Sequence, residues 1–229
     1  EMVRRAELAV QLQDLLVTLI EEARVQPEEH MISILANGKL EGEDRLLTHG
    51  ECVSILNQFL VAGHETTSST FGWGMLMLCQ NTDIQDQVRS DASLTKIFVE
   101  EALRLEAPVQ GLPRQVTKDT ELGGYPLKKG ELIMLRFGAA NRDESQFECA
   151  HMMDLQRPKA KAGAQLAFGS GVHFCPGAPL ARQELTLGFP SLLQKMRNLR
   201  LSSNHDIPTA DPSFLLRNLP ELHIEWDPE

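Results

Sequence analysis

The chain has 229 residues, of which 42% are hydrophobic and 24% are charged, as is typical of a folded globular protein. Its 22 basic and 32 acidic side chains give a formal net charge of -10 at pH 7. This argues against nucleic acid as a partner, because phosphate binding favours a basic surface. No run of about 18 apolar residues is present, so the sequence predicts no membrane span. Four cysteines without a CxxC pair predict reduced thiols in a cytoplasmic compartment.

The first part of the chain is predicted to be helical. Apolar residues recur at spacings of three and four over residues 1–24, which predicts an amphipathic helix. Residues 25–47 are predicted to be loop with one short helical piece. A long helix is expected at about 48–80, since Thr48 and Glu51 have the spacing of a capping box. The residues that follow are apolar on nearly every side, which predicts a helix buried all round.

The centre of the chain changes from helix to strand. Residues 83–105 are predicted to be helical, with a segment of the pattern E-x-x-R at about 93–105. A Gly-Gly turn signal and a short apolar run at 132–135 predict strands within 116–137. Mixed elements of this kind predict a mainly α fold with small β-sheets.

The last third of the chain contains a long irregular stretch followed by a helix. Residues 138–177 carry several Gly and Pro, and such stretches are usually functional or disordered. Residues 178–199 have a helical period, interrupted by Pro190. The tail is predicted to form short strands and turns, with a strand at 222–224.

One cysteine in the irregular stretch lies among glycines. Residues 168–177 read Phe-Gly-Ser-Gly-Val-His-Phe-Cys-Pro-Gly. The glycines allow the backbone to bend tightly and to approach a flat group. Cys175 precedes an expected helix start, where backbone N–H groups would stabilise a thiolate. The residues alone leave two interpretations open: a thiolate presented on a rigid loop, or a buried structural cysteine in a glycine-rich turn.

This segment resembles the haem-binding loop, F-x-x-G-x-x-x-C-x-G, of the cytochrome P450 family of haem-thiolate monooxygenases, in its soluble, bacterial-like form. The matching residues are Phe168, Gly171, Cys175 and Gly177. The resemblance implies that Cys175 is the thiolate ligand of the haem iron, a ligand that favours cleavage of the O–O bond. It also implies that Phe168 packs near the ligand, that Gly169 lines the cofactor and that His173 hydrogen-bonds a haem propionate.

A second resemblance concerns three charged residues. Glu101 and Arg104 match the family's E-x-x-R pair, and their spacing places both on one face of a helix. Taken alone, such a pair is usually a solvated ion pair. Arg157 matches the arginine that completes a structural ionic cluster in the family. Met153 stands where the family usually has Phe, whereas Phe147 matches the earlier aromatic of that segment.

A third resemblance lies within the expected long helix. Residues 62–67, Ala-Gly-His-Glu-Thr-Thr, resemble the family's oxygen-activating motif. The resemblance implies that Gly63 leaves room for a diatomic ligand and that Ala62 lines the haem. It further implies that Thr66 hydrogen-bonds the oxygen or a water beside it, and that Glu65 passes protons inward as a catalytic acid. The alternative is a solvated polar turn of helix, which fits poorly with the apolar flanks.

Further basic residues occupy positions that the family uses. Arg114 follows Pro113 where the family places an arginine that binds a haem propionate, and the alternative is a surface arginine. Lys159, Lys161 and Arg182 lie near the cysteine loop and are candidates for a basic docking patch, the alternative being ordinary solubilising charge. The electron donors that the resemblance implies are NAD(P)H, a ferredoxin reductase and a ferredoxin.

The resemblance spans nearly the whole chain. Residues 1–229 are therefore expected to form a partial cytochrome P450 domain, the C-terminal portion of that fold. The implied function is a haem b-dependent monooxygenase that activates O2 at a cysteine-ligated iron and oxidises a small organic substrate. The chain is far shorter than family members, and its start at Glu1 favours a piece of a longer protein over a natural truncation.

Two alternatives remain open. A peroxide-driven or isomerising haem-thiolate enzyme predicts loss of the acid–alcohol pair, which is present here as Glu65 and Thr66. A truncated haem-binding or scaffold protein without turnover predicts haem binding but no substrate-dependent use of NAD(P)H.

Overall fold

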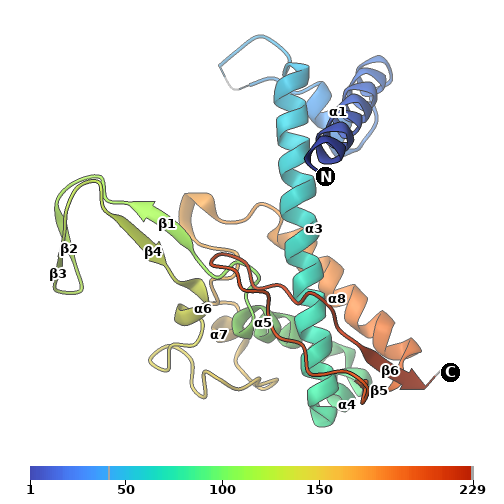
Figure 1. Cartoon of the computed structure of the whole chain (residues 1–229), viewed down its shortest axis with the longest axis vertical. Helices are drawn as coiled ribbons and strands as arrows, with labels where there is room; N and C mark the ends of the chain where they lie inside the picture. The colour runs from blue at the N-terminus through green and yellow to red at the C-terminus, as the bar shows by residue number, and fades with distance from the viewer. Residues whose placement is uncertain (41, 228–229) are drawn as a thin grey trace. The chain divides into compact units, whose positions relative to one another are not determined.

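The structure is a computed structural model that describes residues 1–40 and 42–227. The chain divides into two compact units, residues 1–64 and 65–229, within the span that the sequence predicts as one partial domain. Helix α3 (His49–Gln80) contains residues of both units (Figure 1).

The first unit is helical. Helices α1 (Met2–Val25) and α2 (Met31–Ala36) pack with the first turns of α3. Arg24 fastens the unit, since its guanidinium donates hydrogen bonds to the carbonyl oxygens of Ala36 and Leu47. The buried apolar residues are Leu16, Ile20, Ala23, Ala36, Leu47, Cys52 and Leu56.

The capping box expected at the start of α3 is confirmed. The backbone N–H of Thr48 donates to Glu51 Oε2 at 2.7 Å, and the backbone N–H of Glu51 donates to Thr48 Oγ1 at 3.2 Å. Arg45 adds two hydrogen bonds to the same carboxylate, at 2.8 and 3.0 Å. Two otherwise unpaired N–H groups of the helix start are satisfied in this way.

This cap predicts an acid-sensitive helix start. The hydrogen bond from Arg45, followed by those from Thr48, lowers the pKa of Glu51 from 4.5 to about 2. Because the folded-state pKa is the lower one, the stabilisation is complete above 4.5 and is lost as the pH falls towards 2. We expect the protection of amides in the first turn of α3, measured relative to their intrinsic exchange rates at the same pH, to fall as the pH drops from 4.5 towards 2. Glu51→Gln should show fast exchange already at neutral pH.

Glu43→Gln is the matched control, because Glu43 also pairs with Arg45, at 2.6 Å, but makes no bond to the helix start. Equal exchange rates in the two variants would contradict the capping role of Glu51.

The predicted burial of α3 on all sides is wrong for one stretch. Phe59, Leu60 and Val61 are 43%, 49% and 68% exposed. Within the first unit, the buried core reaches along α3 only as far as Leu56, so the following turn has no apolar partner there. None of the helices in the described part of the chain has both the length and the apolar content needed to cross a membrane.

In the second unit, the helical run expected at 83–105 is interrupted. It contains α4 (Thr82–Ser90), the 3-10 helix η1 (Ala92–Leu94) and α5 (Thr95–Leu105). Asp91 separates α4 from η1, because its carboxylate accepts a hydrogen bond from the backbone N–H of Ser93 at 2.9 Å. A side chain that caps a new helix start competes with continuation of the preceding helix.

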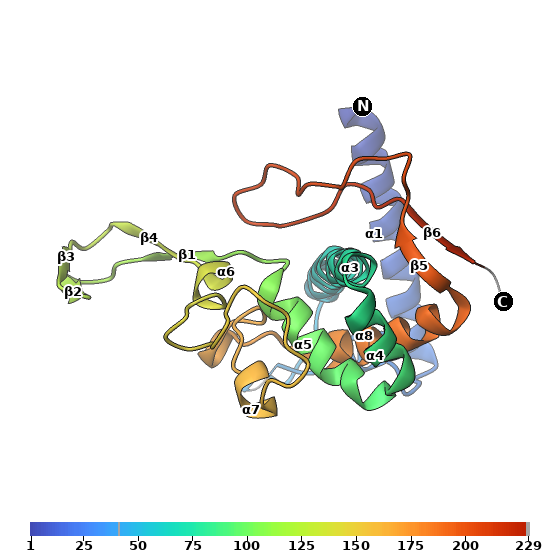
Figure 2. The same cartoon turned by 90° about the horizontal axis from the view of Figure 1, so that it is seen from below.

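Helices α3 and α8 (Ala178–Lys195) cross closely in the second unit, as the end-on view of α3 shows (Figure 2). A Cβ atom at Gly74 would lie 2.3 Å from the ring of Phe189, and one at Gly188 would lie 2.4 Å from the ring of Phe71. The Phe189 ring packs 4.9 Å from Phe71 and, edge to face, 5.0 Å from Phe98 of α5. Glycine at these two positions therefore permits the aromatic core that joins the helices.

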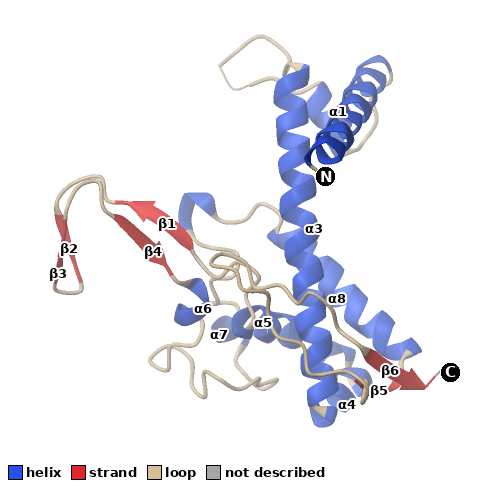
Figure 3. Cartoon of the chain, in the orientation of Figure 1, coloured by secondary structure: helices blue, strands red, loops and turns tan. Residues whose placement is uncertain are grey.

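The strands in the described part of the chain form three short antiparallel pairs (Figure 3). They are β1 (Leu112–Gln115) with β4 (Leu132–Leu135), β2 (Thr120–Leu122) with β3 (Tyr125–Leu127), and β5 (Arg197–Leu201) with β6 (Ile224–Asp227). Gly123 and Gly124 make the turn between β2 and β3 with φ of +60° and +85°. The predicted fold class, mainly α with small β-sheets, is confirmed.

The predicted end of the last helix is wrong. Residues 178–199 were expected to be helical, but α8 ends at Lys195 and β5 begins at Arg197. Leu199 is a buried residue of β5. Its spacing from Met196 and Leu192 also matches a helical period, which explains why the sequence predicted a longer helix. The strand at the C-terminus likewise begins at Ile224 rather than at residue 222.

Candidate cofactor-binding site

The cysteine loop is a tight turn that leads into α8. The backbone N–H of Cys175 donates to the carbonyl oxygen of Phe168 at 3.0 Å, and a 3-10 turn, η2 (Gly171–His173), lies between them. Gly169 and Gly171 have φ of +71° and +75°. Side chains other than glycine are strained in this region, so the loop requires glycine at both positions.

The thiol of Cys175 is half-buried at the surface of this loop. Cys52, by contrast, is fully buried, and burial raises the pKa of the Cys79 thiol to about 11. Val172 and Phe174, beside Cys175 in the loop, are 96% and 48% exposed. A partly accessible thiol with exposed apolar neighbours fits a flat apolar group that carries a metal, and does not fit a buried structural cysteine.

Phe168 joins the loop to the core of the second unit. Its ring packs against the buried apolar cluster and lies 6.4 Å from the Phe174 ring. The Arg182 guanidinium stacks over the Phe168 ring at 4.5 Å and pairs with Glu100 of α5 at 2.5 Å. Gln165 donates to the same carboxylate at 3.1 Å. Gln165 before the loop and Arg182 after it therefore both connect the loop to Glu100 of α5.

Arg182, one of the docking charges expected from the sequence, is paired with Glu100 and is 32% exposed. Glu100 itself is a residue that sequence reasoning missed. Its neighbour Glu101 carries the recognisable i, i+3 spacing, whereas the partners of Glu100 lie 65 and 82 residues away. No local pattern reveals such a pair.

The structure brings Glu101, Arg104 and Arg157 into one buried cluster. Arg104 makes two parallel hydrogen bonds to the Glu101 carboxylate, at 2.8 and 2.9 Å, and Arg157 Nε donates to Glu101 Oε1 at 2.8 Å. The side chains of Glu101 and Arg104 are 0% exposed and that of Arg157 is 4% exposed. A solvated ion pair does not describe this arrangement.

The cluster fastens the segment before the cysteine loop to α5. Arg104 donates to carbonyl oxygens of that segment, and the backbone N–H of Asp154 donates to Glu101 at 3.0 Å. Phe147 lies 5.2 Å from the Arg104 guanidinium and 5.9 Å from that of Arg157. The accepting carbonyls belong to Asn141, Ala150 and Met152 for Arg104, and to Glu148 for Arg157.

The motif of the long helix is divided between the two units. Ala62 and Gly63 belong to the first unit, and a Cβ atom at Gly63 would meet nothing within 4 Å. Glu65 and Thr66 belong to the second. The Glu65 side chain accepts a hydrogen bond from Asn218 Nδ2 at 2.6 Å, and the Thr66 carbonyl accepts one from the Thr70 hydroxyl at 2.9 Å.

Arg114 and His173 are both exposed donors. Arg114 lies on β1 opposite Ile133, and its guanidinium contacts the carbonyl oxygen of Pro113 at 2.9 Å. His173 lies at the end of η2. Neither side chain forms an ion pair within residues 1–40 and 42–227, so both remain available to an anionic group.

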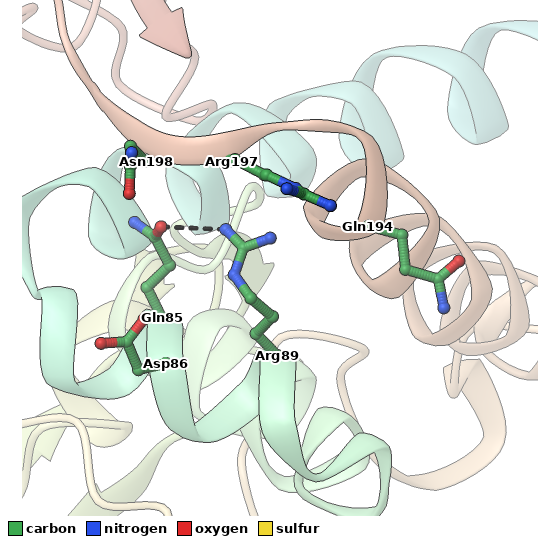
Figure 4. A pocket seen from close by; sticks show the side chains of 6 residues that line it. All are labelled: Gln85, Asp86, Arg89, Gln194, Arg197 and Asn198. Carbon is green, nitrogen blue, oxygen red and sulfur yellow. Dashed lines mark hydrogen bonds between the residues drawn. The ribbon is translucent and has the colours of Figure 1, made fainter. Parts of the chain in front are cut away.

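A separate polar hollow of about 430 Å³ lies between α4, the end of α8 and the start of β5 (Figure 4). The residues that line it are Gln85, Asp86, Arg89, Gln194, Arg197 and Asn198. Arg89 donates to Gln85 at 3.1 Å and to the carbonyl oxygens of Leu193 and Met196. Arg89 thus satisfies the C-terminal carbonyls of α8, and the hollow contains none of the candidate cofactor residues.

A half-buried thiol on a glycine loop, close to a buried Glu–Arg–Arg cluster in a mainly helical fold, is the arrangement expected of a haem-thiolate protein. The chain belongs to the cytochrome P450 family, whose family model matches residues 2–224. Haem is the cofactor of this family.

Known relatives are similar over nearly all of the chain. Cytochrome P450 107B1 of Saccharopolyspora erythraea is 35% identical over 96% of this chain and 53% of its own length. Pulcherriminic acid synthase of Bacillus subtilis is 36% identical over 95% of this chain and 54% of its own length. The structure of CYP109E1 from Bacillus megaterium with testosterone superposes with a TM-score of 0.90 at 30% identity, covering 99% of this chain and 61% of that one. The chain spans about half the length of the curated relatives it matches.

Proposed function

We propose that the protein is a haem b-dependent monooxygenase that activates O2 at a cysteine-ligated iron and oxidises a small organic substrate. The observation that carries this proposal is the half-buried Cys175 thiol on its glycine loop directly before α8. When bound, the haem supplies the redox chemistry, and a thiolate ligand favours cleavage of the O–O bond. The chain's own residues bind the cofactor and move protons.

Residues of the cysteine loop and of β1 are suited to hold the cofactor. Cys175 provides the iron ligand, and Phe168 fixes the loop that carries it. Gly169 and Gly177 present backbone without side chains, which allows a flat ring to approach. Arg114 and His173 are exposed donors of the type that binds carboxylates, and we assign them to the haem propionates. Ala62 and Gly63 offer a small-residue surface on α3, which we assign to the oxygen-binding side.

Proton movement is assigned to Glu65 and Thr66. Glu65 is exposed to solvent, whereas Thr66 is half-buried one residue further along α3. A carboxyl group that passes a proton to a hydroxyl is a common arrangement for general acid catalysis. A peroxide-driven or isomerising enzyme has no need of this pair, so its presence favours the monooxygenase.

We assign electron supply to NAD(P)H through a ferredoxin reductase and a ferredoxin, in the cytoplasm. Lys159 and Lys161, on the short helix α7 (Lys159–Ala162), are exposed and retain the docking role proposed from the sequence. An acidic donor would be steered towards such charges. Substituting both lysines by Gln should lower the affinity for the donor without changing the affinity for substrate.

The test of the proposed iron ligand is spectroscopic. Ferrous haem with a thiolate ligand and carbon monoxide gives a strongly red-shifted absorption band. Cys175→Ala and Cys175→His should abolish this band, whereas Cys149→Ser should keep it, because Cys149 is exposed outside the loop. A band that survives in both Cys175 variants would show that another residue is the ligand.

A further inference from the structure

The C-terminal segment is fastened along one face of α3. Glu65, Ser69 and Trp73 are spaced by four residues and share that face. The carbonyl oxygen of Arg217 accepts hydrogen bonds from Ser69 Oγ and Trp73 Nε1, both at 2.8 Å. The next residue, Asn218, donates from Nδ2 to Glu65 Oε1 at 2.6 Å. The proposed catalytic acid is therefore the third contact point of this segment on the helix.

The backbone of the segment is held independently of the Asn218 side chain. The backbone N–H of Arg217 donates to the carbonyl oxygen of Pro108 at 2.9 Å, and that of Asp211 donates to the carbonyl oxygen of Asn218 at 3.0 Å. The Arg217 guanidinium pairs with the buried Glu106, which also binds Arg142 at 3.0 Å. The same guanidinium stacks over the Trp73 ring at 4.8 Å. These contacts hold the backbone at Asn218 in place, so the position of its side chain beside Glu65 does not depend on the Asn218–Glu65 hydrogen bond.

The Asn218 side chain has one hydrogen-bond partner in the described part of the chain, and that partner is Glu65. Its Oδ1 is buried without a partner among the same residues. Buried polar atoms are normally paired, so an unpaired one calls for an explanation. Among the described residues, the Asn218 side-chain amide makes no other hydrogen bond. We therefore look for its role in the contact with the Glu65 carboxylate.

We propose that Asn218 is a positioning residue that holds the Glu65 carboxylate in place for proton transfer. This inference rests on the proposed function, in which Glu65 passes protons towards bound oxygen. A hydrogen bond to an ionised carboxylate is short and directional, and the 2.6 Å distance fits this type. Without the amide, the exposed Glu65 side chain would sample several rotamers and would reach the proton-transfer position less often.

The test uses the full-length, haem-loaded protein with its electron donors. Asn218→Ala should lower the product formed per NAD(P)H by about tenfold, the effect of losing one hydrogen bond to a charged group. The KM for substrate should not change, and the solvent isotope effect on O2 consumption should increase. Asn218→Gln, which keeps an amide donor, should recover part of the coupling. Asn204→Ala, at an exposed loop position, is the matched control and should behave as the parent protein.

A crystal structure of Asn218→Ala supplies a readout that does not depend on turnover. It should show the Glu65 carboxylate displaced or in several rotamers, with residues 216–219 unmoved. A single, unmoved Glu65 rotamer together with unchanged coupling would overturn the inference.

A double-mutant cycle separates this inference from the proposed function. If Asn218 acts through Glu65, adding Asn218→Ala to Glu65→Gln should cause no further loss of coupling. Additive losses would overturn the positioning role. If Glu65→Gln alone neither slows NAD(P)H consumption nor lowers coupling, the proposed proton-transfer function fails. The Glu65 rotamer in Asn218→Ala then still decides whether Asn218 positions it.

Discussion

Replacing Glu101 by Gln is expected to destabilise the second unit by about 3–5 kcal/mol, because it leaves two buried arginines without their counter-charge. Glu101 is fully buried and binds both Arg104 and Arg157. Guanidinium groups remain charged at any pH that a protein survives, so they have no means of neutralisation. The loss should be measured as a lower free energy of unfolding in chemical denaturation, and haem retention should fall with it.

Glu100→Gln is the matched control. Its partner Arg182 is 32% exposed, so water compensates part of the lost ion pair, and a loss of about 1 kcal/mol is expected. Equal losses in the two variants would contradict the assigned structural role of the buried cluster. Replacing the whole cluster by apolar residues should not restore stability, because carbonyl oxygens such as those of Asn141 and Met152 would lose their donors.

Under the proposed function, replacing Thr66 by Ala is expected to divert electrons from product formation to hydrogen peroxide. General acid assistance is typically worth about 10²–10⁴-fold, and without it electrons from NAD(P)H would leave as hydrogen peroxide instead of entering product. NAD(P)H consumption and haem binding should persist, while product is lost. The measurement is the ratio of product, and of peroxide, to NAD(P)H consumed.

Two companion variants make this result interpretable. Thr67→Ala should be milder, because one residue along a helix turns the side chain by about 100°. Glu65→Gln should slow the whole cycle, because it interrupts the proton supply itself. Unchanged coupling in Thr66→Ala would contradict the proton-delivery role and would favour a haem-binding protein without turnover.

Features that depend on neighbours in the sequence were predicted directly from the residues. The capping box of Thr48 and Glu51 was predicted correctly, since its hydrogen bonds join residues three positions apart. The turn at Gly123 and Gly124 is equally local. The end of α8 was misplaced because the periodicity of Leu199 fits both a helix and a buried strand position.

The cysteine loop and the charged cluster were predicted by resemblance rather than by spacing. The family is confirmed by the match over residues 2–224, whereas the roles of Cys175, Glu65 and Thr66 remain predictions. The sequence alone did not separate a buried pair from a solvated one at Glu101 and Arg104. Their burial follows from the segment that α5 contacts, which lies some forty to fifty residues further along the chain.

By itself, the sequence determined most helices and the fold class, which depend on residues that are contiguous or locally spaced. Through resemblance of short motifs it also indicated the family. Only the tertiary structure decided that Arg182 pairs with Glu100 and that Glu65 accepts a hydrogen bond from Asn218. These pairs are separated by 82 and 153 residues. No local pattern encodes such contacts, because they form only when packing of the helices brings distant segments together.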